Sequence, residues 1–498
     1  MRFTGSAWIA GISLLGISLA GGAAAECAKR PRYGGTLRVE LQAAKISIDP
    51  REWRAGMEEA AAAQKLAALV FDRLLSLDDY GRIQPQLAAA WSHDAAFKRW
   101  QFTIRSGVKF TDGTLLSAAE AATALRALLP AKRQVSGAGD SLVLQSPEAM
   151  PELLEELASP KYVVFHVGSG GALAGTGPFV AVDGAPAGHL LFRANEECWA
   201  GRPFVDAVDV ALGVPPLRRL YDLQLRRAEL IELPADLVRR ANDVGLRTWT
   251  SAPVRLYALR FDESRPGANE PRLREAVSQS LDRATMASVL LQKQGEPAAA
   301  LLPQWLSGYA SLFTVENDPA RAKALRADLP ANVASAAEPL RLRVDAPGDM
   351  AKLLGERVAV NARQSQWIVQ SAGHAAARAA AGSEAARNEP APDLRLIVWR
   401  YGSLSASAEM ESLAAGQELG DASGSNSAAE GPERLYERER RLLEERRVTP
   451  LVLLPEFVGI GANVRDWMPA RWGEWRLADV WLDTEEPASP PKAGGAQP

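Results

Sequence analysis

Residues 88–120 read AAAWSHDAAFKRWQFTIRSGVKFTDGTLLSAAE, and no other segment says as much about the architecture of the chain. Trp100, Phe102 and Ile104 alternate with polar residues, which is the period-2 pattern of a strand with one buried face. Ser-Gly and Asp-Gly turn signals bracket the next apolar stretch, 108–110, as they do in a β-hairpin. The segment therefore predicts strands that fold back on one another.

A helix is expected directly after these strands. Ser117 has the properties of an N-cap, and Glu120 follows three residues later as in a capping box. The alanine-rich run that begins here is interrupted at Pro130, which cannot continue a helix. A hairpin and a capped helix together form one compact α/β unit.

Strand and helix patterns also alternate on both sides of this unit. Period-2 or short apolar runs predict strands at 36–41, 142–144, 162–167, 190–193, 208–212, 340–344, 394–399 and 451–454. Apolar residues at helical spacing predict helices at 58–75, 151–157, 216–227, 271–291, 318–327, 350–362 and 432–445. The alternation is typical of the α/β class.

Composition limits both the size of each domain and the choice of partners. A chain of 498 residues with 47% hydrophobic and 23% charged residues exceeds one compact core, so we expect two or three domains. The formal net charge is −3, which provides no overall field to attract nucleic acid or an anionic membrane. Nucleic-acid binding is therefore not expected.

Residues 1–25 have the pattern of an export signal. Arg2 supplies the positive start, an uncharged apolar run follows, and small residues precede Glu26. An uncleaved membrane anchor is the alternative, but several glycines lower the hydrophobicity of this run below that of a typical span. We therefore favour cleavage near Glu26.

The two cysteines, Cys27 and Cys198, are the only thiols of the chain. An exported protein meets an oxidising compartment, where such a pair can form a disulfide. Lipidation of Cys27 is less favoured because Glu26, rather than a small residue, precedes it. Two thiols supply too few ligands for a closed zinc site, and we expect neither a metal nor another cofactor.

Motifs that carry catalysis are absent from the sequence. The four histidines, at 93, 166, 189 and 374, lie in no recognisable catalytic pattern, and the chain contains no GxSxG, HExxH or CxxC. The glycine-rich stretch 168–177 lacks both a dinucleotide fingerprint and a P-loop lysine, and we interpret it as a turn. A non-catalytic protein is therefore expected.

The order of these landmarks resembles family 5 of the bacterial extracellular solute-binding proteins, which contains the periplasmic dipeptide- and oligopeptide-binding proteins. The hairpin and helix of 88–120 carry the most specific part of the resemblance. The other matching stretches, in order, are GGTLRV at 34–39, VFDRLLSLDDYGRIQPQLAAAW at 70–91, GTGPF at 175–179, CWAGRPFVDAV at 198–208, LREAVSQSLDR at 273–283, VTPLVLL at 448–454 and WRLADVWL at 475–482. Each stretch alone is weak evidence of the family, but their shared order indicates that the chain resembles a divergent member of it.

The resemblance implies a two-lobed, periplasmic-binding-protein-like α/β fold with an extra inserted domain and mixed sheets flanked by helices. The expected divisions are a signal peptide at 1–25, a discontinuous first lobe at 28–71, 175–258 and 462–485, an inserted domain at 72–174, a second lobe at 259–461 and a disordered tail at 486–498. The lobes are expected to close on a ligand by hinge motion.

The resemblance also implies a function. We expect a monomer in the periplasm that captures a small ligand, peptide or peptide-like, and delivers it to the permease subunits of an ABC importer in the inner membrane. The alternative is a divergent interaction or sensor protein that keeps the fold but has lost the transported ligand. A cleft with convergent polar groups favours the first, and a cleft filled by its own side chains favours the second.

One departure from the family weakens the peptide assignment. Peptide binders of this family carry an aspartate, after the strand equivalent to 394–399, that pairs with the ligand's α-amino group. Residues 399–406, WRYGSLSA, contain no acid, and the next is Glu409. A buried ammonium without a counter-charge is costly, so a standard peptide is disfavoured and Arg400 raises the alternative of an anionic ligand. Arg400 pointing to solvent is an equally good interpretation.

Aromatic residues at the expected cleft walls complete the candidate site. Flat rings give large apolar contact at small entropic cost. The candidate ligand-binding residues are Trp53, Trp399, Arg400, Tyr401 and Ser403. For the aromatic ones the alternative is burial in the core of a lobe.

Overall fold

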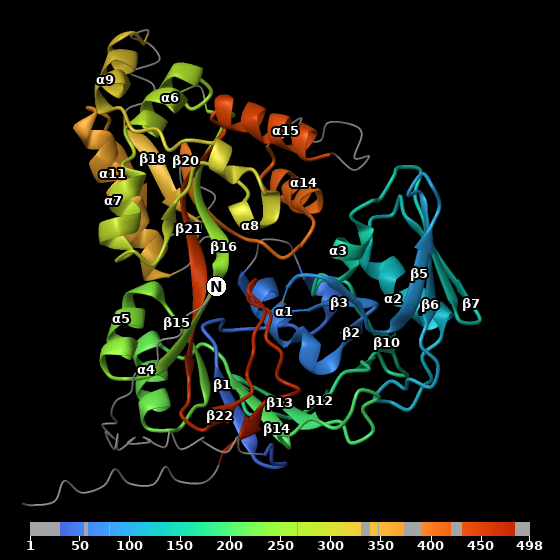
Figure 1. The fold of residues 1–498 in the computed structure, drawn as a ribbon. Coiled ribbons are helices and arrows are strands. Elements are labelled where there is room, and N and C mark those ends of the chain that lie inside the picture. Colours follow the sequence, from blue (N-terminus) through green and yellow to red (C-terminus); the bar gives the residue numbers. More distant parts are fainter. Residues whose placement is uncertain are drawn as a thin grey trace, which may run out of the picture.

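The computed structural model describes residues 30–53, 58–78, 80–265, 267–329, 339–346, 348–372, 391–419 and 431–483. Its ribbon separates into a first lobe at the bottom of Figure 1, a second lobe above it, and a smaller side unit to the right. The expected signal segment 1–25, Cys27 and the tail 486–498 lie outside the described residues. No helix within the described ranges is long and apolar enough to cross a membrane.

One mixed sheet of eleven strands runs through both lobes in the order β12-β13-β14-β1-β15-β21-β16-β20-β18-β19, with β17 paired to β21. Its strands are β1 (Thr36–Glu40), β12 (Phe179–Val182), β13 (His189–Ala194), β14 (Ala207–Ala211), β15 (Leu230–Leu233), β16 (Arg247–Phe261), β17 (Glu296–Pro297), β18 (Leu340–Val344), β19 (Val369–Ala372), β20 (Leu394–Arg400) and β21 (Val448–Ile460). β1 is parallel to β14 and β15, and β18 is parallel to β19 and β20, whereas β16 and β21 are antiparallel to their long neighbours. The predicted two-lobed α/β fold with a mixed sheet is confirmed.

Strands β16 and β21 pass from one lobe into the other (Figure 1). Twelve of the thirteen residues of β21 are buried, as expected for an apolar run that is covered on both faces. The register between the two strands shifts around Pro253, which lies opposite Pro455. Proline has no N–H for the ladder, so the sheet is least continuous at this level.

The side unit contains the segment with the hairpin and the capped helix. An antiparallel sheet, β5-β6-β8-β7, packs against α2 (Ala118–Leu128), with α3 (Leu153–Leu157) beside them. Its strands are β5 (Ala88–His93), β6 (Arg99–Ile104), β7 (Gln134–Ala138) and β8 (Ser141–Gln145). Alternate residues of β6 are buried, as the period-2 pattern predicts.

Two details of this unit differ from the sequence prediction. Ser117 caps α2 by accepting from the Glu120 N–H at 3.2 Å, but the Glu120 carboxylate lies 2.9 Å from His166 Nδ1 instead of completing a capping box. The stretch 108–110 forms one isolated bridge, Lys109 to Leu115, rather than a strand. The Glu120 carboxylate therefore contacts His166 instead of the Ser117 backbone, and a single bridge takes the place of the predicted strand at 108–110.

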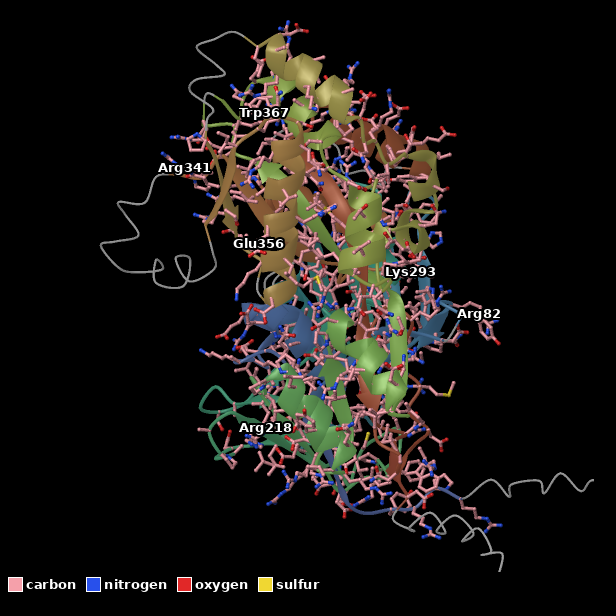
Figure 2. All side chains as sticks on the ribbon, turned by 90° about the vertical axis from the view of Figure 1, so that its left-hand side faces the viewer. Arg82, Arg218, Lys293, Arg341, Glu356 and Trp367 are labelled. Atoms are coloured by element: carbon pink, nitrogen blue, oxygen red, sulfur yellow. The ribbon has the colours of Figure 1, made fainter. Side chains whose placement is uncertain are left out.

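Helices cover both faces of the main sheet. In Figure 2, α11, α7, α5 and α4 line one face from the second lobe to the first, with Glu356 marking α11 and Arg218 marking α4. The bounds are α1 (Glu58–Val70), α4 (Pro216–Gln224), α5 (Ala235–Asp243), α6 (Pro271–Gln279), α7 (Arg283–Thr285), α8 (Gln304–Ser307), α9 (Pro319–Ala327), α11 (Asp349–Gln364), α14 (Ala406–Gly416) and α15 (Pro432–Glu444). Short elements complete the chain: η1 (Pro50–Glu52), β2 (Asp72–Arg73), β3 (Leu75–Leu77), β4 (Ile83–Pro85), β9 (Val163–Val164), β10 (His166–Val167), β11 (Leu173–Ala174), η2 (Met286–Leu290), η3 (Ala310–Leu312), β22 (Val464–Arg465) and β23 (Trp481–Leu482).

Two predicted helices are shorter than expected. The predicted helix 271–291 is interrupted after α6, because Asp282 caps a new turn by accepting from Thr285 N at 2.9 Å. The predicted helix 58–75 ends at Val70, where Gly177 N donates to the Val70 carbonyl at 2.9 Å. The ends of α6 and α1 thus depend on contacts that cannot be predicted from the spacing of apolar residues.

Candidate functional site

A small pocket lies where the two lobes and the side unit meet. The second lobe lines it with residues 400–404 after β20 and with Trp305 of α8, and the first lobe lines it with Lys65 of α1 and the segment Trp472–Glu474. The free space within it is about 10 Å³, which is room for about one water molecule. This pocket is therefore nearly filled by the side chains that line it.

A buried ion-pair network lies at the floor of this pocket. Lys65 pairs with Glu232 of β15 and, at 3.2 Å, with Glu456 of β21. Glu456 also pairs with Arg400 at 2.9 Å and with Arg255 of β16 at 3.4 Å. The network thus connects α1 of the first lobe to β20 of the second through the two long strands.

The charges of this network hold Glu456 ionised. Burial alone would raise the pKa of Glu456, but the positive charges of Arg400, Lys65 and Arg255 outweigh burial and hold the pKa well below its usual range. The same balance, with Lys65 the main positive charge, lowers the pKa of Glu232. Both carboxylates therefore remain negative at neutral pH.

Positive charge exceeds negative charge around this floor. Arg219 of α4 is 0% exposed, and the three nitrogens of its guanidinium have no hydrogen-bond partner among the described residues. It lies within electrostatic range of Glu232, Glu40 and Arg255. Burial and the neighbouring Asp222 raise the pKa of Glu40 to about 7, so Glu40 offsets Arg219 only in part. The arrangement can therefore accommodate an additional anion.

Three of the five candidate residues meet at the pocket. Arg400, Tyr401 and Ser403 line it. Arg400 does not point to solvent, because only 7% of it is exposed and its Nε donates to Glu456. The Tyr401 hydroxyl donates to the Leu301 carbonyl. The Tyr401 ring and the Arg400 guanidinium are thus held in place by contacts within the protein.

The remaining two candidates lie away from this pocket. Trp399 is buried in a core cluster of the second lobe, and its Nε1 donates to Glu409 Oε1 at 2.6 Å. Trp53 is 8% exposed, and its Nε1 donates to the Ser47 carbonyl at 2.9 Å. The core interpretation that the sequence left open thus describes both tryptophans.

The loop after β20 is fixed by Glu409. Its Oε2 accepts from Gly402 N at 3.1 Å and from Ser403 N at 2.8 Å, and burial raises its pKa. Because both carboxylate oxygens are occupied by the loop and by Trp399, Glu409 does not offer a free acid to a ligand ammonium.

The side unit is bonded to the same loop. Glu152 Oε2 accepts from Ser405 Oγ at 2.5 Å and from Ser407 Oγ at 2.8 Å, and Ser159 Oγ donates to the Gly402 carbonyl at 2.5 Å. These three bonds join the side unit to the start of α14 in the second lobe. They stabilise the closed arrangement of the cleft.

Four charged residues at or next to the pocket were not predicted from sequence: Lys65, Glu456 and the ion pair of Glu474 and Arg73. Glu474 accepts from Arg73 at 2.6 and 3.1 Å, and it lines the pocket. Lys65 and Glu456 each interrupt an apolar run, AAAAQKLAALV and TPLVLLPEFVGI. A charge inside a buried run must find a partner, and this signal could have identified both residues.

The chain matches one family model in comparison with known proteins. Residues 82–329 match the model of the bacterial extracellular solute-binding proteins, family 5 Middle. The nickel-binding periplasmic protein of Escherichia coli (strain K12) is 25% identical over 288 residues, which cover 52% of this chain and 55% of that protein. Di/tripeptide-binding protein 2 of Pseudomonas aeruginosa (strain UCBPP-PA14) is 24% identical over 58% of this chain and 63% of that protein. The chain thus spans less than two thirds of these relatives.

Solved structures share the fold over almost the whole chain. The dipeptide-binding protein of Pseudoalteromonas sp. SM9913, in complex with Met-Leu, superposes with a TM-score of 0.75 at 14% identity over 90% of this chain and 100% of that one. NikA of Brucella suis, in complex with Fe(III)-EDTA, gives 0.73 at 18% identity over the same shares. At these identities the likeness establishes the fold alone.

Proposed function

The chain belongs to family 5 of the bacterial extracellular solute-binding proteins, and from this we propose that it captures a small solute between its lobes for an ABC importer. The observation that supports this most is the pocket at the junction of the lobes, where cationic, acidic and aromatic side chains converge. Export through residues 1–25 to the periplasm, action as a monomer and delivery to inner-membrane permease subunits complete the proposal.

The proposed ligand is a small anion rather than a standard peptide. Lys65, Arg219, Arg255 and Arg400 surround two ionised carboxylates, those of Glu232 and Glu456, so the floor carries excess positive charge. An anion would reduce the cost of burying these cations.

A peptide α-amino group would meet no free carboxylate at this pocket. Glu474 is paired with Arg73, Glu456 is shared by three cations, and Glu409 is bonded to its own loop. The described residues contain no group of three or more His, Cys, Asp or Glu side chains that could hold a bare metal ion.

Opening of the lobes is expected to occur at the level of Pro253 and Pro455. The register of β16 and β21 shifts there, and Glu456 is the next residue after Pro455. A ligand that reaches the Glu456 network therefore contacts the hinge directly, which is how ligand binding would favour the closed form. The expected residue boundaries of the lobes, 258/259 and 461/462, remain a proposal.

The interaction or sensor function is a second candidate, favoured by the filled cleft. About 10 Å³ of free space excludes any solute larger than water unless the lobes part. A chain whose closed form is stabilised by its own ion pairs would have no need of a ligand. The two candidates differ in whether a solute competes with those internal pairs.

Calorimetry distinguishes these functions. Acetate, succinate and phosphate serve as anionic probes, and Ala-Ala serves as a standard dipeptide. Capture predicts that at least one anion binds and that Arg400→Gln weakens it about tenfold or more, the loss of one charged hydrogen bond. Arg434→Gln, which changes an exposed arginine on α15, is the matched control and should leave binding unchanged. Tight binding of Ala-Ala alone would contradict the anionic class.

A variant that restores an acid tests whether its absence is the reason that a standard dipeptide is disfavoured. Ser403→Asp places a carboxylate at the pocket and should raise affinity for Ala-Ala, since a charge-assisted bond is worth about 1.5–3 kcal/mol. Ser405→Asp is unsuitable, because Ser405 Oγ already donates to Glu152 and a second carboxylate would repel it. No change in Ala-Ala affinity with Ser403→Asp would count against this assignment of the site.

A further inference from the structure

A second cavity lies inside the second lobe, away from the interlobe pocket. Its free volume is about 220 Å³, and it opens between α15, the segment after η3 and the first residues of β21. Pro450 at this cavity and Glu456 at the interlobe network are separated along β21, and at about 3.4 Å per strand residue the two sites are roughly 20 Å apart. The cavity is therefore distinct from the proposed solute site.

Two arginines form the inner wall of this cavity. Arg283 is buried and donates to the Pro450 carbonyl at 2.7 Å, to the Glu316 carbonyl at 2.7 Å and to Ser278 Oγ at 3.1 Å. Arg446 donates to the same Ser278 Oγ at 3.1 Å and to Glu316 Oε2 at 2.8 Å. A single hydroxyl thus holds two like charges side by side.

The inner wall carries uncompensated positive charge. The Glu316 carboxylate accepts from Arg446 and, at 2.6 Å, from Gln279 Nε2, whereas Arg283 donates to the Glu316 backbone carbonyl. Three of the five N–H groups of Arg283 and two of the five of Arg446 find acceptors among the described residues. Arg440 at the rim is already paired with Glu437 and Glu444. Both arginines line the cavity, and each has N–H groups for which no acceptor is found among the described residues.

The outer wall is apolar and aromatic. The rings of Phe313 and Tyr436 lie 5.1 Å apart with planes inclined by 33°, and Leu443 of α15 continues this wall. Leu312, beside Phe313, is 64% exposed. An exposed apolar wall next to unpaired donors is the usual composition of a small-molecule site.

We propose that this cavity binds a small monocarboxylate with a flat apolar body. Its carboxylate accepts hydrogen bonds from Arg283 and Arg446, whose planar forks match a carboxylate. Its body lies against Phe313 and Tyr436. One net positive charge on the inner wall matches a single negative charge, and about 220 Å³ limits the body to the size of one substituted ring.

Fluorine NMR with 4-fluorobenzoate as the probe tests this site on the purified protein. We expect saturable binding, roughly tenfold or more weakening by Arg446→Gln, and similar weakening when the neutral 4-fluorobenzamide replaces the acid. Arg434→Gln, which changes an exposed arginine of α15 outside the cavity lining, is the matched control and should change affinity less than about threefold. Phe313→Ala tests the apolar wall without touching the arginine pair.

The results that overturn the proposal are specific. No binding of 4-fluorobenzoate to the native protein, or equal binding of the acid and the amide, would refute it. Binding abolished by Arg400→Gln but kept in Arg446→Gln and Phe313→Ala would place the probe in the interlobe pocket, which refutes this site and leaves the proposed solute capture intact. If Arg446→Gln does not fold, Phe313→Ala and the amide decide the question.

Discussion

Replacing Glu456 with glutamine should destabilise the protein strongly, because Glu456 balances three cations at the junction of the lobes. Its carboxylate lies 2.9 Å from Arg400, 3.2 Å from Lys65 and 3.4 Å from Arg255, and all four side chains are largely removed from solvent. Removing one partner of a buried ion pair costs about 3–5 kcal/mol, since it leaves buried charge uncompensated. We expect a loss of this size in the free energy of unfolding.

The pH dependence of this loss has a definite sign. The folded-state pKa of Glu456 lies well below its unfolded value of about 4.3, so its ion pairs stabilise the fold fully above that value. This stabilisation disappears as pH falls through the lower folded-state pKa. The difference in unfolding free energy between wild type and Glu456→Gln should therefore be largest at neutral pH and shrink below about pH 4.

Urea denaturation at pH 7 and pH 3.5 measures both effects. Glu437→Gln, which breaks an exposed pair with Arg440, is the matched control and should cost no more than about 1 kcal/mol. Small-angle scattering shows whether the Glu456→Gln protein is also more open. A Glu456→Gln protein within 1 kcal/mol of wild type at pH 7 would refute the reasoning that this network holds the lobes together.

Three further predictions follow from individual side chains. Gly175→Ala should destabilise severely, because its Cβ would lie 1.8 Å from the Val70 carbonyl oxygen. Gly431→Ala has nothing within 4 Å and should cost only about 1 kcal/mol or less, the cost of alanine at the N-cap of α15. Equal melting points in thermal melts would contradict this. Burial raises the pKa of Glu439 to about 7, so the fold favours its protonated form. The stability of Glu439→Gln relative to wild type should therefore increase as pH rises from 5 to 8. A difference in urea midpoint that stays constant over this range would exclude the titration of Glu439 as the cause. Glu152→Ala should open the cleft by removing the acceptor of Ser405 and Ser407, and an unchanged radius of gyration would show that these bonds do not hold it closed.

Local pattern was sufficient for the framework of the fold. The alternation in β6 and the cap at Ser117 are both present, because each depends on residues within one turn or one strand. The helix predicted to run unbroken to position 291 failed at Asp282, where a side chain that can accept from Thr285 N competes with the helix. The helix α14 was not predicted, although Ser405 caps it by accepting from Ala408 N at 3.1 Å.

The sequence placed some residues of the candidate site together and not others. Arg400, Tyr401 and Ser403 follow one strand, so their common position at its end could be inferred from sequence. Lys65 and Glu456 lie far apart in the chain, and only the tertiary fold brings them together. Trp399 ends the apolar run 396–399 and Trp53 follows the turn at Asp49-Pro50, and both rings lie in core clusters.

Native mass spectrometry of the protein purified without unfolding would identify a solute that it carries. We expect a bound small anion in the wild-type protein that is absent from Arg400→Gln and retained in Arg434→Gln. A wild-type protein that carries a peptide with a free N-terminus would contradict the anionic class of ligand, and a wild-type protein that is always empty would contradict solute capture itself.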